Sequence, residues 1–409
     1  KPVVPPADKP TAVHQNAAAD DVTDDDDPIF GKASLSPASA PGPAEAKDAV
    51  GSFISAMRPS APAPTATATS TGRESADTIR QAVEATARDI LAAPPVAGLE
   101  RAWRSLRMVM ASCPNADDLA VDAVDTDLDG LLAALTGPLS ADPWHRPDAV
   151  FVVEPIGDAE TLRALADLAD ESRVPIVVEV LPALIGFSPG SDTLLEPPAA
   201  WSELCEHTAA GWLCACVGTP VLAHETDGGD RTVFGGAATA IAAIAAASVA
   251  DSGVPAALVG RDGALVAPAA HTVDAHGHTQ TIPTETFIAY RTQRDLAQRG
   301  ITALGSEADS DRIRLAATPM VAGEMALPAR IVAGRAHRLA VAVRQALGPG
   351  ASAQALEQAL EEASGVFLPR ISAGDVTLRV RNVAPDGVTV DASIGAVLAG
   401  ASVTFSSDV

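Results

Sequence analysis

The stretch VFVVEPIGDAETLRALADLADESRVPIVVEVLPAL, residues 150–184, decides the fold class. It opens with the continuous apolar run Val150 to Val153, which is typical of a strand buried on both faces. Asp158 to Asp170 follows with leucines at helical spacing, and Val174 to Leu184 is again strand-like. Strand, helix and strand in this order predict a βαβ unit and a mostly parallel sheet, so the fold class is α/β.

Further elements are expected on both sides of this unit. Apolar residues at helical spacing predict helices over the following ranges: Glu74 to Leu91, Val96 to Met110, Ala237 to Ala250, Arg291 to Arg299, Leu327 to Leu347 and Ala353 to Ala363. Short strands are expected at Ala257 to Val259 and at Phe287 to Tyr290.

The last part of the chain changes to a period of two. Asp375 to Val383 and Gly387 to Ala396 alternate apolar and polar residues, with Ala384-Pro385-Asp386-Gly387 as the turn between them. This pattern predicts a β-hairpin, and a third short strand is expected at Ser402 to Ser406.

The first part of the chain reads as an extension and an arm. Residues 1–46 are rich in Pro, Ala and Asp and carry the run Asp24 to Asp27, so they are expected to remain a flexible acidic extension. The acidic run is interpreted as solubilising, with a cation site or a docking tag as the alternatives.

A short helix is expected from Lys47 to Arg58, with an apolar stripe that either docks on its own core or binds a partner. The stripe consists of Val50, Phe53, Ile54 and Met57. Pro59 to Gly72 then forms a linker in which Thr65, Thr67 and Thr69 alternate with small residues, which indicates either an extended strand or a polyproline-like spacer.

Composition bounds the function. The chain has 409 residues, 47% of them hydrophobic, and a net charge of −24, which argues against a protein that binds nucleic acid or an anionic membrane surface. Four cysteines fit a reducing compartment. The longest apolar run, Phe234 to Ala250, is Ala-rich and short for a membrane span, and a start at Lys1 without a signal peptide indicates a processed or truncated chain.

One motif resembles the nucleophile elbow of a hydrolase. Gly186-Phe187-Ser188-Pro189-Gly190 fits G-x-S-x-G after a strand. Pro189 has no N–H to donate to an oxyanion, so an α/β hydrolase-like enzyme that uses Ser188 is kept only as an alternative.

Cysteines and histidines gather in two places without the spacing of a zinc site. Cys205, His207, Cys214, Cys216 and His224 form the denser group, for which buried packing is the favoured interpretation and zinc the alternative. His271, His276 and His278 are expected in an exposed polar turn, with a cation site as the alternative. We therefore predict no catalytic residue, no metal and no cofactor.

Two blocks resemble a known family. Leu99-Glu100-Arg101-Ala102-Trp103-Arg104-Ser105-Leu106-Arg107 resembles the L-E-A-S-W-R-G-L block of the large subunit of the type VI secretion contractile sheath, the TssC or VipB family. Ile282-Pro283-Thr284-Glu285, which runs on to Leu304, resembles the K-I-P-T-E-V segment of the same family and the stretch after it. The blocks stand in the expected order, and the likeness spans roughly Lys47 to Val409.

The resemblance implies a non-enzymatic, phage-tail-sheath-like protein of the bacterial cytoplasm, docked to a membrane-anchored baseplate. It implies a helical polymer of many copies with a small sheath subunit (TssB-like) around an inner tube protein (Hcp-like). The assembly would contract to propel the tube into target cells, and a AAA+ recycling ATPase (ClpV-like) would then take it apart. A non-contractile, sheath-related scaffold remains an alternative.

The resemblance also assigns roles along the chain. After the additional acidic extension of residues 1–46, it divides the chain into an arm over 47–73, a core over 74–374 and strands over 375–409 that are shared between subunits. The residues expected to share strands are Thr65, Thr67, Thr69, Val376, Leu378, Val380, Val388 and Val390. The residues expected to contact the ATPase are Val50, Phe53, Ile54 and Met57.

Overall fold

The computed structural model describes residues 68–113, 119–190, 193–226, 230–275, 277–348, 350–367, 376–384, 387–395 and 403–408. The chain divides into two compact units, Lys1–Arg73 and Glu74–Val409. All of the structure below, apart from the first residues of one helix, belongs to the second unit.

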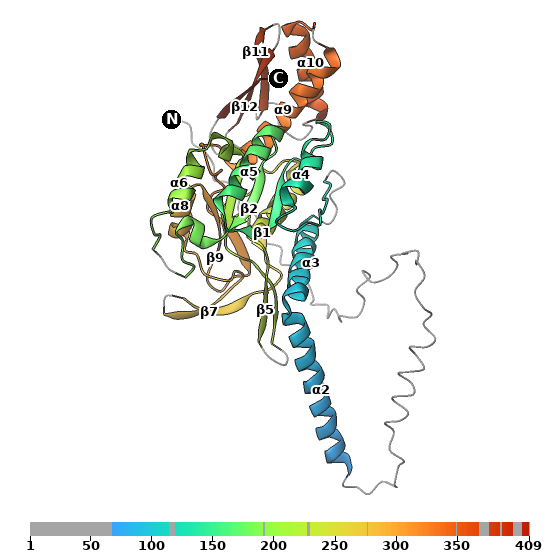
Figure 1. The fold of residues 1–409 in the computed structure, drawn as a ribbon, viewed down its shortest axis with the longest axis vertical. Helices are drawn as coiled ribbons and strands as arrows, with labels where there is room; N and C mark the ends of the chain where they lie inside the picture. The colour runs from blue at the N-terminus through green and yellow to red at the C-terminus, as the bar shows by residue number, and fades with distance from the viewer. Residues whose placement is uncertain are drawn as a thin grey trace, which may run out of the picture. The chain divides into compact units, whose positions relative to one another are not determined.

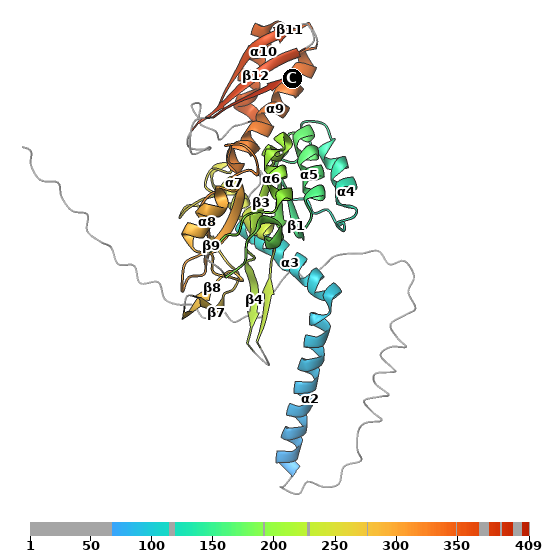
Figure 2. The ribbon, with the colours of Figure 1, turned by 60° about the vertical axis from the view of Figure 1, so that its left-hand side comes forward.

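The centre of this unit is a six-stranded mixed sheet with the strand order β1-β2-β3-β9-β10-β6. Its strands β1, β2, β3 and β9 are labelled in Figures 1 and 2. The strands are β1 (Val150–Ile156), β2 (Ile176–Val180), β3 (Leu213–Val217), β9 (Ile301–Ser306), β10 (Arg312–Leu315) and β6 (Leu265–Val266). The first four are parallel, and β10 and β6 are each antiparallel to their neighbour. The predicted βαβ unit is therefore confirmed as β1, α5 (Ala159–Ser172) and β2.

Alternation along the central strands divides the core into two layers. Leu213, Ala215 and Val217 of β3 face α5 and the short elements α4 (Leu131–Leu139), η2 (Pro182–Ile185), α6 (Ala199–Glu206) and η3 (Thr208–Trp212). Cys214 and Cys216 face the opposite layer, built from α3 (Pro94–Ser112) and α7 (Ala237–Ser252). Helix α7 is the predicted buried, Ala-rich helix, and its alanines let it lie close to the sheet.

Two hairpins extend from the sheet layer, and one short helix follows them. β4 (Val221–Glu225) pairs with β5 (Arg231–Phe234), and β7 (His271–Ala275) pairs with β8 (His278–Ile282). α8 (Tyr290–Ala297) then leads into β9.

The C-terminal part is a second, three-stranded antiparallel sheet of β11 (Val376–Ala384), β12 (Gly387–Ile394) and β13 (Val403–Asp408). The long helix α9 (Leu327–Leu347) and α10 (Ala353–Phe367) pack on one face of it. The predicted hairpin and third strand are confirmed, and α9 has the predicted bounds.

The structure corrects several expectations. The strand expected to run to Leu184 ends at Val180, because Pro182 opens the 3₁₀ turn η2. Ala257 to Val259 is a loop with Leu258 fully buried, and Phe287 to Tyr290 is a loop that ends at the start of α8. His271 and His278 lie on paired strands rather than in a polar turn, and His276 lies outside the described residues.

Candidate assembly surfaces

The C-terminal sheet has one dry face and one wet face. Val390, Ala392 and Ile394 of β12 are buried against α9 and α10. On the other face, Arg381 donates to Asp391 and to Ser406, so the three strands are tied together by a polar network in water. Among the described residues, no strand pairs with the outer edge of β11 or of β13.

Several of the residues predicted to share strands between subunits have side chains that are buried or half-buried within their own chain. Val376, Leu378 and Val380 of β11 are half-buried, and Val390 is buried against helices of its own chain. Val388 lies on β12 in register with Val383. The side chains of Val376, Leu378, Val380 and Val390 therefore anchor the sheet to its own subunit, which leaves the main chain of β11 and β13 as the groups that could pair with a neighbour.

A stack of rings and one guanidinium joins the C-terminal sheet to the body. The guanidinium of Arg330 on α9 lies 4.5 Å from the ring centre of Trp212 and 5.8 Å from that of Phe405 on β13. Burial lowers the pKa of Arg330 to about 10, with a further contribution from Arg173. Because three elements meet in this stack, it fixes β13 to α9 and η3.

We call the region where β13, α9 and η3 meet the joint. Its second contact is a hydrogen bond between the side chains of His337 of α9 and Ser407 of β13. Burial lowers the pKa of His337 to about 4, and the nearby Arg173, Arg338 and Arg146 add to the shift. The imidazole is therefore neutral at pH 7. Arg335 and Arg338 of the same helix form ion pairs with Asp148, next to β1, so α9 connects the two sheets.

The arm predicted for the linker is wrong from Ala68 onward. Thr69 lies in helix α2 (Ala68–Ala92) and not in an extended strand, whereas Thr65 and Thr67 lie outside the described residues. Residues 73–92 are rich in strong helix formers, and each residue added to an existing helix gains a hydrogen bond. This gain outweighs the β preference of threonine. Val50, Phe53, Ile54 and Met57 also lie outside the described residues, so the ATPase contact stays a prediction.

The first family-like block lies on α3, and this helix has two apolar faces. Met108 and Val109 are buried towards α7, whereas Leu99 and Trp103 are exposed on the other side. A tryptophan that is 64% exposed on a well-formed helix is unusual, because it leaves a large apolar area in water.

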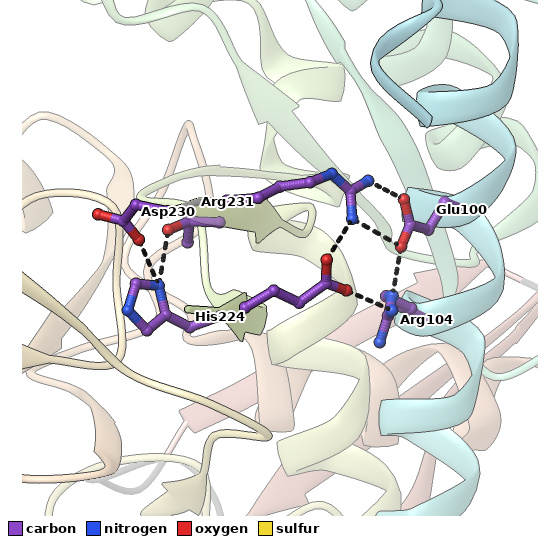
Figure 3. A network of polar contacts seen from close by, with 7 residues as sticks. Glu100, Arg104, His224, Asp230 and Arg231 are labelled. Carbon is purple, nitrogen blue, oxygen red and sulfur yellow. Dashed lines mark hydrogen bonds and ion pairs between the residues drawn. The ribbon is translucent and has the colours of Figure 1, made fainter. Parts of the chain in front are cut away.

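Charged residues of the same block hold the β4–β5 hairpin on α3 (Figure 3). Glu100 accepts from Arg231 of β5 and from Arg104, and Arg231 also donates to Glu225 of β4. Burial acts to raise the pKa of Glu100, but the hydrogen bonds from Arg231 and Arg104 outweigh it and lower the pKa. In the neighbouring pair of the hairpin, His224 contacts Thr232 and Asp230. The network thus holds α3 and the β4–β5 hairpin together, although the two are far apart in sequence.

The second family-like block joins the two hairpins. Ile282, Pro283 and Thr284 are buried at the end of β8, and the carbonyl of Pro283 accepts from the amide of Val221 at the start of β4. Glu285 is exposed and accepts from the hydroxyl of Thr219 at 2.6 Å. The residues of this block therefore have structural partners within the chain.

One buried carboxylate stands at the carboxyl end of the parallel strands. Glu179 of β2 accepts from the amide of Ala237 at the N-terminus of α7 at 2.6 Å and lies 3.7 Å from Arg101 of α3. Burial raises its pKa to about 7, against the amide of Ala237 and Arg101, which lower it.

The residues considered for catalysis or metal binding do not come together. Ser188 is exposed in a loop, and the next helix after it begins only at Ala199. Cys216 donates to the carbonyl of Val178 on one side of β3, and Cys205 lies on α6 in the other layer. In the described part of the chain, no three His, Cys, Asp or Glu side chains are placed to hold a metal ion. A hollow of about 450 Å³ between α8 and β10 has none of these serine, cysteine and histidine residues in its lining.

Sequence reasoning missed the joint around Arg330 and the role of Arg231. A signal for the first existed, because Arg330 stands among apolar residues on the core side of the predicted helix. Arg231 had no such signal, since its partner Glu100 is 131 residues away.

Comparison with known proteins gives matches in structure only. No protein-family model and no curated protein sequence matches the chain. A chain of the anti-feeding prophage baseplate is 13% identical over 73% of this chain and 76% of that chain, with a TM-score of 0.39. The sheath tail protein Lin1278 from Listeria innocua is 11% identical over 69% and 59%, with a TM-score of 0.32. The anti-feeding prophage helical sheath in its contracted state is 13% identical over 64% and 66%, with a TM-score of 0.35. None of the described helices is long and apolar enough to cross a membrane.

Proposed function

We propose that this chain is a structural subunit of a contractile sheath. The observation that carries the proposal is the C-terminal sheet, which is fastened to its own chain by one face and whose outer edges pair with none of the described strands. An open strand edge is a template for a strand of another chain, since it presents a row of main-chain donors and acceptors. Such an edge suits a polymer and serves no chemical reaction.

The joint explains how such an edge could carry force. A pull on β13 would pass through Phe405 and Ser407 into α9, and from α9 through Arg338 to Asp148 beside the central sheet. Each step uses buried or half-buried groups. The shared ladder could therefore persist while the bodies of neighbouring subunits move.

The two sequence blocks support the same proposal. They are the residues that resemble the sheath family, and they occupy two kinds of place: the second joins hairpins inside the chain, and the first places Leu99 and Trp103 on the surface. A subunit that is packed on several sides by neighbours needs surface residues of this kind.

In this proposal many copies polymerise with a small sheath subunit around an inner tube in the bacterial cytoplasm, starting from a baseplate. The extended polymer stores free energy, and its contraction drives the tube outward. Residues 375–409 carry the shared strands, and Val50, Phe53, Ile54 and Met57 bind the AAA+ ATPase that recycles the contracted form.

The test is electron microscopy of the chain co-expressed with its small partner, which should form long hollow cylinders. Successive residues of a strand direct their N–H groups to opposite sides, so of Thr377→Pro and Leu378→Pro one removes a donor that faces away from β12. That variant should keep the circular dichroism of the wild type, melt no lower than the alanine variant of the same position, and form no cylinders. The other should lose a bond inside the sheet and melt at a lower temperature.

Thr377→Val keeps the main-chain donor and serves as the matched control, which should still assemble. On β13, Thr404→Pro and Phe405→Pro test the other edge, and Phe405→Ala measures separately what the loss of the packed ring costs. Cylinders of normal length from all four proline variants would contradict the proposal.

A further inference from the structure

Helix α2 and helix α3 each carry an apolar stripe that faces water. On α2 the stripe is Ile79, Val83, Thr86 and Ile90, and on α3 it is Leu99, Trp103, Leu106 and Met110. Six of these eight side chains are large and apolar and are between 50% and 64% exposed. From Ser75 to Ile90, Arg88 alone is half-buried and every other residue is exposed.

The two stripes have the same spacing, with steps of four, three and four residues. This is the heptad spacing of a helix that packs along another helix. A water-exposed seam of this kind on two successive helices is not explained by the core of the chain, since α3 already buries Met108 and Val109 on its other side.

The stripes are also mirror images in sequence about the junction between the helices. Ile79 and Met110 lie equally far from the Pro94–Pro95 pair, and so do Thr86 and Trp103. Ala93, in an extended conformation, separates α2 from α3 at this point. An antiparallel pairing of two identical arms, with a twofold axis at the prolines, therefore places every stripe residue of α2 opposite one of α3.

In that register the sizes are complementary. Trp103, the largest member, faces Thr86, the smallest, and Val83 faces Leu106. Alternation of large and small side chains lets two helices interdigitate. The six exposed side chains amount to on the order of 600 Å² per copy, close to the ~800 Å² that each partner contributes to a stable interface.

We propose that the arm formed by α2 and α3 binds a second copy of this chain, with α2 of each copy packed antiparallel on α3 of the other. The contact is isologous, so each pair of residues occurs twice. It uses neither the C-terminal sheet nor a small subunit. Because all copies in a sheath that grows from one baseplate point the same way, a twofold pair cannot lie inside the sheath, and the contact is proposed for the chain before assembly.

Disulfide trapping with the purified full chain tests the pairing. Chains that carry Thr86→Cys and chains that carry Trp103→Cys, each with a different tag, are mixed and oxidised. A cross-linked heterodimer is expected from this mixture. Gln81→Cys is exposed on the opposite side of α2 and replaces Thr86→Cys in the control mixture, which should give at least tenfold less product. The wild-type chain gives the background from its own cysteines.

Trp103→Asp should weaken self-association at least tenfold in sedimentation experiments while its circular dichroism stays that of the wild type, because the side chain is exposed. Three results would overturn the pairing. The first is equal cross-linking in the control mixture. The second is efficient cross-linking only between Val83→Cys and Trp103→Cys, which indicates parallel helices. The third is unchanged self-association of Trp103→Asp together with loss of small-subunit binding. The sheath proposal is read separately from cylinders in the microscope, so either can fail alone.

Discussion

The central sheet and the C-terminal sheet differ in how many of their faces are covered by helices. The central sheet is covered on both faces by helices, and its middle strands β2 and β3 are buried along their whole length. The C-terminal sheet is covered on one face and wet on the other, and its outer strands are open among the described residues.

The difference separates a sheet whose groups are satisfied within the described chain from one whose edge groups are open to water. Because both faces of the central sheet are covered, its strands are stabilised by close packing of apolar side chains. Removing even a small part of a buried side chain therefore lowers the free energy of unfolding. One covered face and open edges leave the C-terminal sheet with main-chain groups that bond to water and are available to a further strand. Three predictions follow the contrast from the largest expected effect to the smallest.

Leucines at matched positions should differ in cost. Leu213 of β3 is fully buried between the two layers, whereas Leu378 of β11 is half-buried. Leu213→Ala should lower the free energy of unfolding by about 2–5 kcal/mol. Leu378→Ala should lower it by less than half of that, because the side chain already contacts water. Urea denaturation of both variants measures the contrast, and equal losses would refute it.

The central sheet should also carry a pH dependence through Glu179. Burial raises the pKa of this carboxyl from 4.5 to about 7, so between these pH values the folded chain holds a proton that the unfolded chain has released. This contribution to stability is complete below pH 4.5 and is lost as the pH rises through 7. Between pH 4.5 and 8 the wild type should lose on the order of 3 kcal/mol relative to Glu179→Gln. Denaturation of both proteins at several pH values checks this, and parallel pH profiles would speak against it.

The helix that links the two sheets should be sensitive at one glycine. A Cβ on Gly334 of α9 would lie 2.2 Å from the carbonyl oxygen of Arg173, so α9 can approach this turn only with glycine there. Gly334→Ala should cost about 1–3 kcal/mol of stability. In the control, Gly365→Ala on α10, the new Cβ meets nothing within 4 Å. This control should gain about 0.5–1 kcal/mol from its higher helix propensity. Thermal melting of the two variants should shift in opposite directions, and a shared direction would show that the close approach is unimportant.

Sequence patterns predict helices and strands well where the hydrophobic periodicity continues over many residues. The 21 residues of α9 and the alternation of β11 and β12 are long enough to distinguish a helix from a strand. Short apolar runs are ambiguous. The apolar residues Phe287 to Tyr290 predict a strand, but in the structure this segment is the loop before α8, and Ile288 is buried there without pairing in a sheet. β3 was missed because its alternating small cysteines and alanine gave no strand signal.

The candidate surfaces were predictable only in part. The C-terminal strands were foreseen, but the sequence could not show that Val390 points into its own chain or that Thr69 is helical. Leu99 and Trp103 were noticed as part of a family-like block. That they face water became visible only with α7 on the other side of α3.

By itself, the sequence determined the α/β class, the parallel βαβ unit, the long helix and the C-terminal hairpin, because each rests on a local period or turn. The tertiary structure alone decided the strand order, the pairing of Glu100 with Arg231 and the stack of Trp212, Arg330 and Phe405. These contacts join residues far apart in the chain. Which partner each residue finds depends on how whole layers pack, and no local pattern encodes that choice.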